Sequence, residues 1–193
     1  MALSIGSKKI KTAVFITGRG SNLKSLIKFS KLKKSPISIK IIISNNPKSK
    51  GLSFGKIYKI KKKIFNFKKK TVAEKEILFE LKKNKIDLIC LAGFMKILSK
   101  NFIQNFNGKI LNIHPSLLPK YKGLKTHERA IKNKDKYSGC SVHFVNSKLD
   151  SGKIILKKKI RIKKKDTPQT LAKKILTQEH KLYPKAILKI FSL

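Results

Sequence analysis

The segment Asn112–Pro119 (NIHPSLLP) places an amide and an imidazole directly after a short apolar run. Alternation along a strand puts Asn112 and His114 on one face and Ile113 on the other. An amide N–H beside an imidazole can stabilise the negative charge that develops on an oxygen during acyl transfer. A lone histidine at a strand end is more often a satisfied core or surface residue. Asn112 and the two flanking prolines favour a catalytic role only in part, so both interpretations stay open.

Asp150 is the acid best placed in the sequence to be a partner of His114. It lies in a Leu-Asp-Ser-Gly turn, and the chain has only nine acids. Its carboxylate could orient and charge an imidazole, or it could simply form the turn. Glu179 also lacks an obvious surface role. Three of the other acids are expected on one exposed helix (Glu74, Glu76 and Glu80), one in a turn (Asp135) and one at a helix cap (Asp166). The last two are Asp87 and Glu128.

The loop Gly18–Asn22 (GRGSN) follows a β-rich run and precedes a helical pattern. Backbone N–H groups at a helix N-terminus form a phosphate site. The loop lacks the Lys-Ser/Thr of a Walker sequence. It also departs from a dinucleotide fingerprint, because Leu23 occupies the third glycine position. An ordinary tight strand–helix turn remains an equal alternative.

Cysteine and histidine spacings do not suggest a metal site. The two cysteines, Cys90 and Cys140, are too few for a disulfide framework and lack zinc-ligand spacing. His143 lies in an alternating strand, where packing is the expected role, and His180 follows Glu179 in a helical pattern. We therefore expect no metal.

Apolar runs alternate with helical patterns along the chain, which predicts a mostly parallel twisted sheet with helices on both faces of a single α/β domain. In such a sheet, ligands bind at the carboxyl ends of the strands. The expected strands are 12–17, 37–44, 87–94, 110–114, 140–146 and 154–162, with an uncertain helical turn and strand within 51–67. The expected helices are 23–29, 72–83, 100–106, 126–133 and 167–191.

Length and composition fit one cytoplasmic globular domain. The chain has 193 residues, of which 40% are hydrophobic. No apolar run approaches the ~20 residues that a membrane span needs. The first residues carry no apolar stretch or cleavage site typical of a signal peptide.

The charge balance is unusual, with 48 basic residues against 9 acids and a net charge of +39. Only Arg19, Arg129 and Arg161 are arginine, and the lysines are spread along the whole chain. Base recognition favours arginine, so we expect no specific nucleic-acid partner. A codon-biased genome explains dispersed lysines better. Nonspecific polyanion binding at low salt is still expected, because it needs only charge.

The chain resembles the phosphoribosylglycinamide formyltransferases, folate-dependent enzymes of de novo purine synthesis, over nearly its whole length. The combination of NxHPSLLP with LDSG is typical of folate formyl transfer, and the GSNL, THERAI and TQEH segments favour the glycinamide ribonucleotide branch. The matching segments are VFITGRGSNLKSLI, LAGFMKILS, ILNIHPSLLPKYKGLKTHERAI, SVHFVNSKLDSGKIIL and TQEHKLYPKAI.

The resemblance assigns roles to residues by motif. It implies a catalytic trio of Asn112, His114 and Asp150. It implies that the ribonucleotide is bound by Gly20, Ser21, Asn22 and Glu179. It implies that the folate is bound by Lys70, Met95, Lys96, Ile97, Leu98 and Asn112. Lys70 stands where the family usually has arginine, and lysine keeps the charge without the planar fork.

The implied reaction moves a formyl group from 10-formyltetrahydrofolate to the amine of 5-phosphoribosylglycinamide, with no metal. Asn112 and a protonated His114 would stabilise the oxyanion, and Asp150 would favour the imidazolium form. The resemblance also implies a variable extension at 1–11 and a catalytic domain at 12–193. Small molecules are the expected partners, and the oligomeric state cannot be derived from the sequence.

The sequence leaves three alternative functions to consider. A formyltetrahydrofolate deformylase usually has a preceding regulatory domain, and a methionyl-tRNA formyltransferase usually has a following β domain. We expect no room for either in 193 residues. A polyanion-binding protein on a retired catalytic fold should have lost at least one of Asn112, His114 and Asp150, whereas all three are present.

Overall fold

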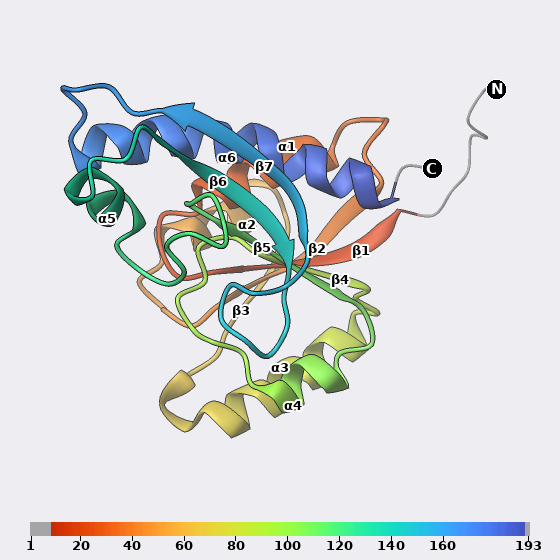
Figure 1. Cartoon of the computed structure of the whole chain (residues 1–193). Helices are drawn as coiled ribbons and strands as arrows, with labels where there is room; N and C mark the ends of the chain where they lie inside the picture. Colours follow the sequence, from red (N-terminus) through yellow and green to blue (C-terminus); the bar gives the residue numbers. More distant parts are fainter. Residues whose placement is uncertain (1–8, 192–193) are drawn as a thin grey trace.

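A seven-stranded sheet organises the computed structural model, which describes residues 9–191 (Figure 1). The strand order is β3-β2-β1-β4-β5-β6-β7. Strands β3 to β5 in this order are parallel, and β6 and β7 are antiparallel additions. The strands are β1 (Ile10–Ile16), β2 (Ile37–Ser44), β3 (Lys61–Ile64), β4 (Leu88–Leu91), β5 (Lys109–His114), β6 (Tyr137–Phe144) and β7 (Ile154–Arg161).

Every predicted helix and strand is present: β2 has the predicted bounds, and the ends of the others shift. The uncertain stretch 51–67 contains a short helix and then strand β3. Residues 1–8 of the expected N-terminal extension lie outside the described residues, and β1 begins at Ile10. The α-helices are α1 (Ser21–Ser30), α2 (Ser53–Ile57), α3 (Lys70–Lys83), α4 (Lys100–Asn105), α5 (Thr126–Lys132) and α6 (Pro168–Phe191), and the 3₁₀ helices are Lys50–Leu52 and Phe67–Lys69.

Two apolar layers enclose the sheet, because side chains alternate along each buried strand. In β1, Val14 and Ile16 face the layer covered by α1 and α6, whereas Ala13 and Phe15 face the layer covered by α3 and α4. Figure 1 shows these two pairs of helices on opposite sides of the sheet. The apolar strands are therefore buried on both faces, as parallel sheets require.

Chain connectivity creates a switch point between β1 and β4. The chain runs from β1 outward through β2 to β3, and then returns through α3 to β4 on the other side of β1. The loops that leave the carboxyl ends of β1 and β4 therefore diverge, and this is where open α/β sheets bind ligands. The Gly18–Asn22 loop and the segment after β4 both begin there.

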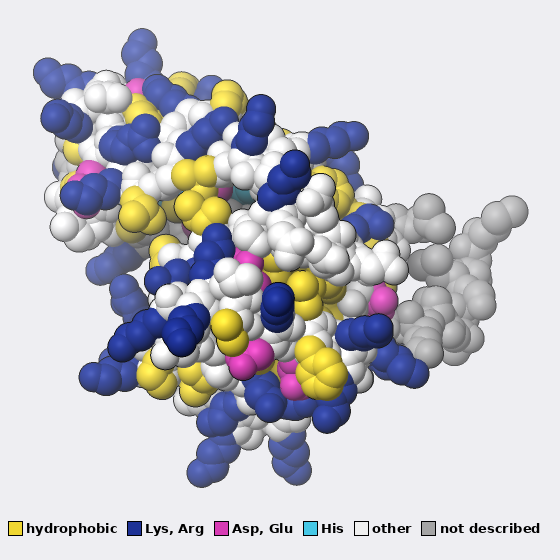
Figure 2. All heavy atoms as spheres, turned by 90° about the horizontal axis from the view of Figure 1, so that it is seen from below, with side chains coloured by type: hydrophobic (Ala, Val, Ile, Leu, Met, Phe, Trp, Pro, Cys, Tyr) yellow, Lys and Arg dark blue, Asp and Glu magenta, His cyan; other side chains and the backbone are white. Residues whose placement is uncertain are grey.

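Both edge strands carry three consecutive exposed lysines, Lys61–Lys63 in β3 and Lys157–Lys159 in β7. Charged side chains at a sheet edge oppose pairing with another chain. Lysine and arginine side chains are spread over the face in Figure 2 and do not form one compact patch. Within residues 9–191, no helix has the length and apolarity needed to cross a membrane.

The prediction that Glu74, Glu76 and Glu80 share an exposed helix is wrong for two of them. Glu74 is 5% exposed and Glu80 is 7% exposed, while Glu76 is exposed. The Glu74 carboxylate accepts hydrogen bonds from the Ser99 backbone N–H at 2.8 Å and hydroxyl at 2.5 Å. Glu80 is bound by Lys61 and by Asn84. Partners supplied by other parts of the chain thus make burial of both carboxylates possible.

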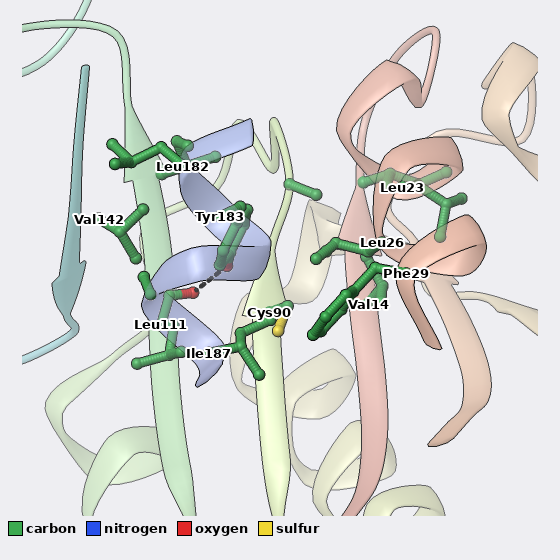
Figure 3. Close-up of a cluster of buried hydrophobic side chains, with 14 of the residues drawn as sticks. Val14, Leu23, Leu26, Phe29, Cys90, Leu111, Val142, Leu182, Tyr183 and Ile187 are labelled. Atoms are coloured by element: carbon green, nitrogen blue, oxygen red, sulfur yellow. Dashed lines mark hydrogen bonds between the residues drawn. The ribbon is translucent and has the colours of Figure 1, made fainter. Parts of the chain in front are cut away.

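Tyr183 fastens α6 to the centre of the sheet (Figure 3). Its side chain is 1% exposed, and its hydroxyl lies 3.0 Å from the Leu111 carbonyl oxygen and 3.2 Å from that of Leu91. These carbonyls belong to β5 and β4, the strands that lead into the candidate site. The phenol therefore supports both strands close to their carboxyl ends.

We expect Tyr183→Phe to lower the free energy of unfolding by about 1–2 kcal/mol, because it leaves buried carbonyl oxygens without this donor. Urea denaturation followed by circular dichroism measures the change. The control is Tyr137→Phe, at a residue that is 42% exposed. Equal stability of both variants and the unmodified protein would contradict the proposed role of the hydroxyl.

Candidate active site

Strand β5 presents Asn112 and His114 at its carboxyl end, as predicted. The intervening Ile113 packs into the apolar layer beneath α6. His114 is 5% exposed. The antiparallel pairing of β5 with β6 places His143 directly opposite Asn112. A functional face thus forms across two neighbouring strands.

Asp150 reaches this face from the loop after β6. Its Oδ2 lies 3.4 Å from His114 Nδ1, and its Oδ1 accepts from Asn112 Nδ2 at 3.4 Å. The backbone of Asp150 is left-handed (φ 45°), a conformation that aspartate tolerates better than most residues. A Cβ at Gly152 would lie 1.8 Å from the Phe144 carbonyl oxygen, so the turn requires glycine there. The structure thus brings Asn112, His114 and Asp150 together.

The loop that follows β5 also contacts His114 and Asp150, through Tyr121 and Gly123. The Tyr121 carbonyl oxygen lies 2.8 Å from His114 Nε2. The Gly123 N–H donates to Asp150 Oδ2 at 2.9 Å. Both nitrogens of the His114 ring therefore face acceptors, so the ring orientation is set from both sides.

Burial and the neighbouring acceptors act in opposite directions on the charge of His114. Burial lowers the pKa of His114 more than the Tyr121 carbonyl and Asp150 raise it. Burial thus favours the neutral form of the ring. Burial opposes ionisation of Asp150, but interactions with His143 and the Gly123 N–H outweigh it, so the pKa of Asp150 lies below its usual value. The free site pairs a carboxylate with an imidazole whose neutral form is favoured by burial.

His143 belongs to this cluster, although the sequence suggested only packing. It is 2% exposed, with Nδ1 2.7 Å from the Phe144 carbonyl oxygen. Its Nε2 lies 3.2 Å from Asn112 Nδ2 and 3.6 Å from Asp150 Oδ1. The cross-strand register of β5 and β6 would have revealed it, but that register is not apparent from one sequence.

The Gly18–Asn22 loop is held against a second turn. Gly20 has φ 74°, and a Cβ on it would lie 2.8 Å from Gly51 Cα. The Gly51 N–H donates to the Gly18 carbonyl at 3.1 Å, and the Ser49 hydroxyl donates to the same oxygen at 2.7 Å. Helix α1 begins at Ser21, and the N–H groups of a first helical turn lack intrahelical partners. The contacts with the second turn therefore fix the conformation of the loop at the start of α1.

Asn22 and Glu179 meet although they are 157 residues apart. Asn22 Nδ2 donates to Glu179 Oε2 at 2.6 Å, and both residues are buried. Burial raises the pKa of Glu179 more than the bond from Asn22 lowers it. Among residues 9–191, the buried Asn22 Oδ1 has no hydrogen-bond partner. A buried carboxylate beside an unused acceptor provides two places for donors of a ligand.

The residues assigned to folate lie beside the switch point. Met95 and Ile97 are 62% and 61% exposed, Lys96 is exposed and Leu98 is buried. The Met95 N–H donates to the hydroxyl of Thr17, next to the glycine loop. Lys70 forms an ion pair with Glu74 at 3.9 Å, and Glu74 in turn binds Ser99, directly after Leu98. Lys70 is thus tied to this segment indirectly.

The described part of the chain contains no group of three or more metal-ligating side chains.

A sequence profile of the formyl transferase family matches residues 10–187. The chain belongs to the formyl transferase family. The match includes the glycine loop, the β5 end, the Asp150 turn and Glu179.

Several of the similar proteins are named phosphoribosylglycinamide formyltransferase. The enzyme of that name from Haemophilus influenzae is 42% identical over 92% of this chain and 85% of its own length. The crystal structure of the Brucella melitensis protein of that name has a TM-score of 0.91 at 39% identity, covering 96% of this chain and 97% of that one. The predicted fold class is thereby confirmed.

The formyl transferase also matches one part of much larger proteins. The human trifunctional purine biosynthetic protein adenosine-3 is 41% identical over 95% of this chain. The chain spans only 18% of the length of that relative, so the match concerns a single portion of it.

We expect Glu179→Gln to raise the free energy of unfolding of this formyl transferase at pH 8. The folded-state pKa of Glu179 is raised above the ordinary 4.5, so the folded state binds this proton more tightly. Stability is therefore lost as pH rises from about 4.5 through the folded-state pKa, and glutamine removes that loss.

Urea denaturation at pH 4 and pH 8 measures the effect, which should be larger at pH 8. Glu76→Gln, at an exposed residue of α3, serves as the control. A Glu179→Gln protein that is less stable than the unmodified protein at pH 8 would contradict the analysis.

Proposed function

We propose that this chain transfers a formyl group from 10-formyltetrahydrofolate to the amine of 5-phosphoribosylglycinamide in purine biosynthesis. Relatives named phosphoribosylglycinamide formyltransferase support the acceptor. The observation that carries the proposal is the convergence of Asn112, His114 and Asp150 at the carboxyl end of one strand. We assign this activity to a catalytic domain formed by residues 12–193.

In the proposed reaction, the acceptor amine attacks the formyl carbon and the carbonyl oxygen takes up negative charge. Asn112 Nδ2 would donate to that oxygen, and the positive charge that His114 gains on protonation would stabilise it further. A neutral His114 can receive the amine proton through water and become imidazolium, which the Asp150 carboxylate stabilises. Collapse of the tetrahedral intermediate breaks the bond from the formyl carbon to N10 of the folate. That nitrogen takes the proton that His114 received from the amine, which returns the imidazole to its neutral form.

Each substrate has a matching surface under this proposal. The phosphate of the ribonucleotide would bind the N–H groups of Gly20, Ser21 and Asn22 at the start of α1. Glu179 and the free Asn22 Oδ1 would accept hydrogen bonds from its sugar or amine. The exposed Met95 and Ile97, with Lys96, Leu98 and Asn112, would line the folate ring site, and Lys70 would attract its carboxylates.

The acceptor is tested by assaying folate product with 10-formyltetrahydrofolate and one acceptor at a time, at moderate salt. We expect turnover with 5-phosphoribosylglycinamide and none with initiator methionyl-tRNA or with water alone. Turnover with tRNA would make the lysine-rich surface a nucleic-acid site. Turnover with water alone would identify a deformylase. Either result would overturn the proposal.

The catalytic trio is tested by His114→Ala and Asp150→Asn. We expect each to lower kcat by at least about 10²-fold, the usual effect of removing one oxyanion-stabilising group, while the folded structure survives. Circular dichroism monitors folding. The control is Asp87→Asn, at an exposed residue just before the amino end of β4, the end opposite the candidate site. Near-normal kcat in either catalytic variant would refute its assigned role.

A further inference from the structure

Arginine is rare in this chain, since only three of 48 basic residues are arginine, and one of them contacts the loop over the candidate site. Arg129 lies in α5, with its guanidinium carbon 4.8 Å from the centroid of the Tyr121 ring. Its Nη1 donates to the Lys122 carbonyl oxygen at 2.8 Å. The guanidinium therefore stacks on one residue and hydrogen-bonds to the next.

These two contacts fall on the segment that touches the trio. Tyr121 faces His114 through its carbonyl oxygen at 2.8 Å, and Gly123 donates its N–H to Asp150 at 2.9 Å. The Lys122 carbonyl held by Arg129 lies between these two bonds along the chain. Movement at Lys122 would therefore disturb the support of both His114 and Asp150.

The segment has a backbone that needs external support. Tyr121 has φ 55° and Gly123 has φ 76°, and a left-handed conformation is costly for a tyrosine. The Tyr121 hydroxyl also accepts a hydrogen bond from Asn133 Nδ2 at 2.8 Å, so helix α5 and the residue after it hold the ring by its face and its edge.

We propose that Arg129 is a positioning residue that fixes Tyr121–Gly123 so that this segment holds His114 and Asp150 in their reactive orientation. This inference rests on the proposed function for its catalytic consequence. A lysine would not suffice, because an ammonium is a point charge without the planar fork that lies over the ring and also donates to Lys122. Lys120 already places such a charge 5.1 Å from the same ring.

The test compares Arg129→Ala and Arg129→Lys with Arg161→Lys, which makes the same replacement at an exposed residue ending β7. One readout is the steady-state kinetics of formyl transfer. The second is hydrogen exchange of the Gly123 amide by NMR, which reports the bond to Asp150 without depending on turnover. Thermal unfolding checks that each variant is folded.

In Arg129→Ala we expect Gly123 exchange to be about tenfold faster and kcat about tenfold lower, the effect of losing one charge-assisted hydrogen bond. KM for 5-phosphoribosylglycinamide should not change, because the glycine loop and Glu179 are untouched. Arg129→Lys should recover little of the loss, and Arg161→Lys should match the unmodified protein.

Unchanged kcat in Arg129→Ala would overturn the inference, and so would an Arg129→Lys protein within about twofold of the unmodified kcat, well inside the expected loss. If the unmodified protein transfers no formyl group to 5-phosphoribosylglycinamide, the proposed function fails instead. Gly123 exchange then decides the positioning role alone, and unchanged exchange in Arg129→Ala would overturn it.

Discussion

The buried Asp150 carboxylate is the interaction on which the candidate site depends. Its side chain is only 8% exposed, and a carboxylate so enclosed is costly unless it is paired. Its partners come from three separate parts of the chain: Asn112 and His114 on β5, His143 on β6, and Gly123 in the loop between them. Satisfying one charge therefore draws the strand ends, the turn and the loop into a single arrangement.

Two of the candidate site residues are titratable groups whose burial opposes their ionisation. His114 and Glu179 are both buried in settings that disfavour their charged forms. Perturbed titrating groups are frequent at functional sites, and buried core groups such as Tyr183 show them as well. Tyr183 adds support from beneath, because its hydroxyl contacts the carbonyls of both strands that lead to the site. The apolar layers thus supply the rigidity that the polar face needs.

Local signals predicted much of this arrangement. The strand–glycine loop–helix pattern placed Gly20 correctly, and alternation placed Asn112 and His114 on one face. What could not be predicted depends on distant pairing. His143 joins the site only through the register of β5 with β6, and Glu74 is buried because Ser99 binds it. The lowered pKa of His114 likewise follows from burial, which composition does not show.

The basic residues fall into two groups: those that need only a positive charge, and those whose geometry matters. Lysines on both edge strands need only be charged to oppose edge-to-edge pairing. A position that must stack on an aromatic face and donate in a fixed direction is different, because only a planar guanidinium does both. A chain that uses lysine almost everywhere therefore makes each remaining arginine informative, and Arg129 stands where geometry, more than charge, sets the requirement.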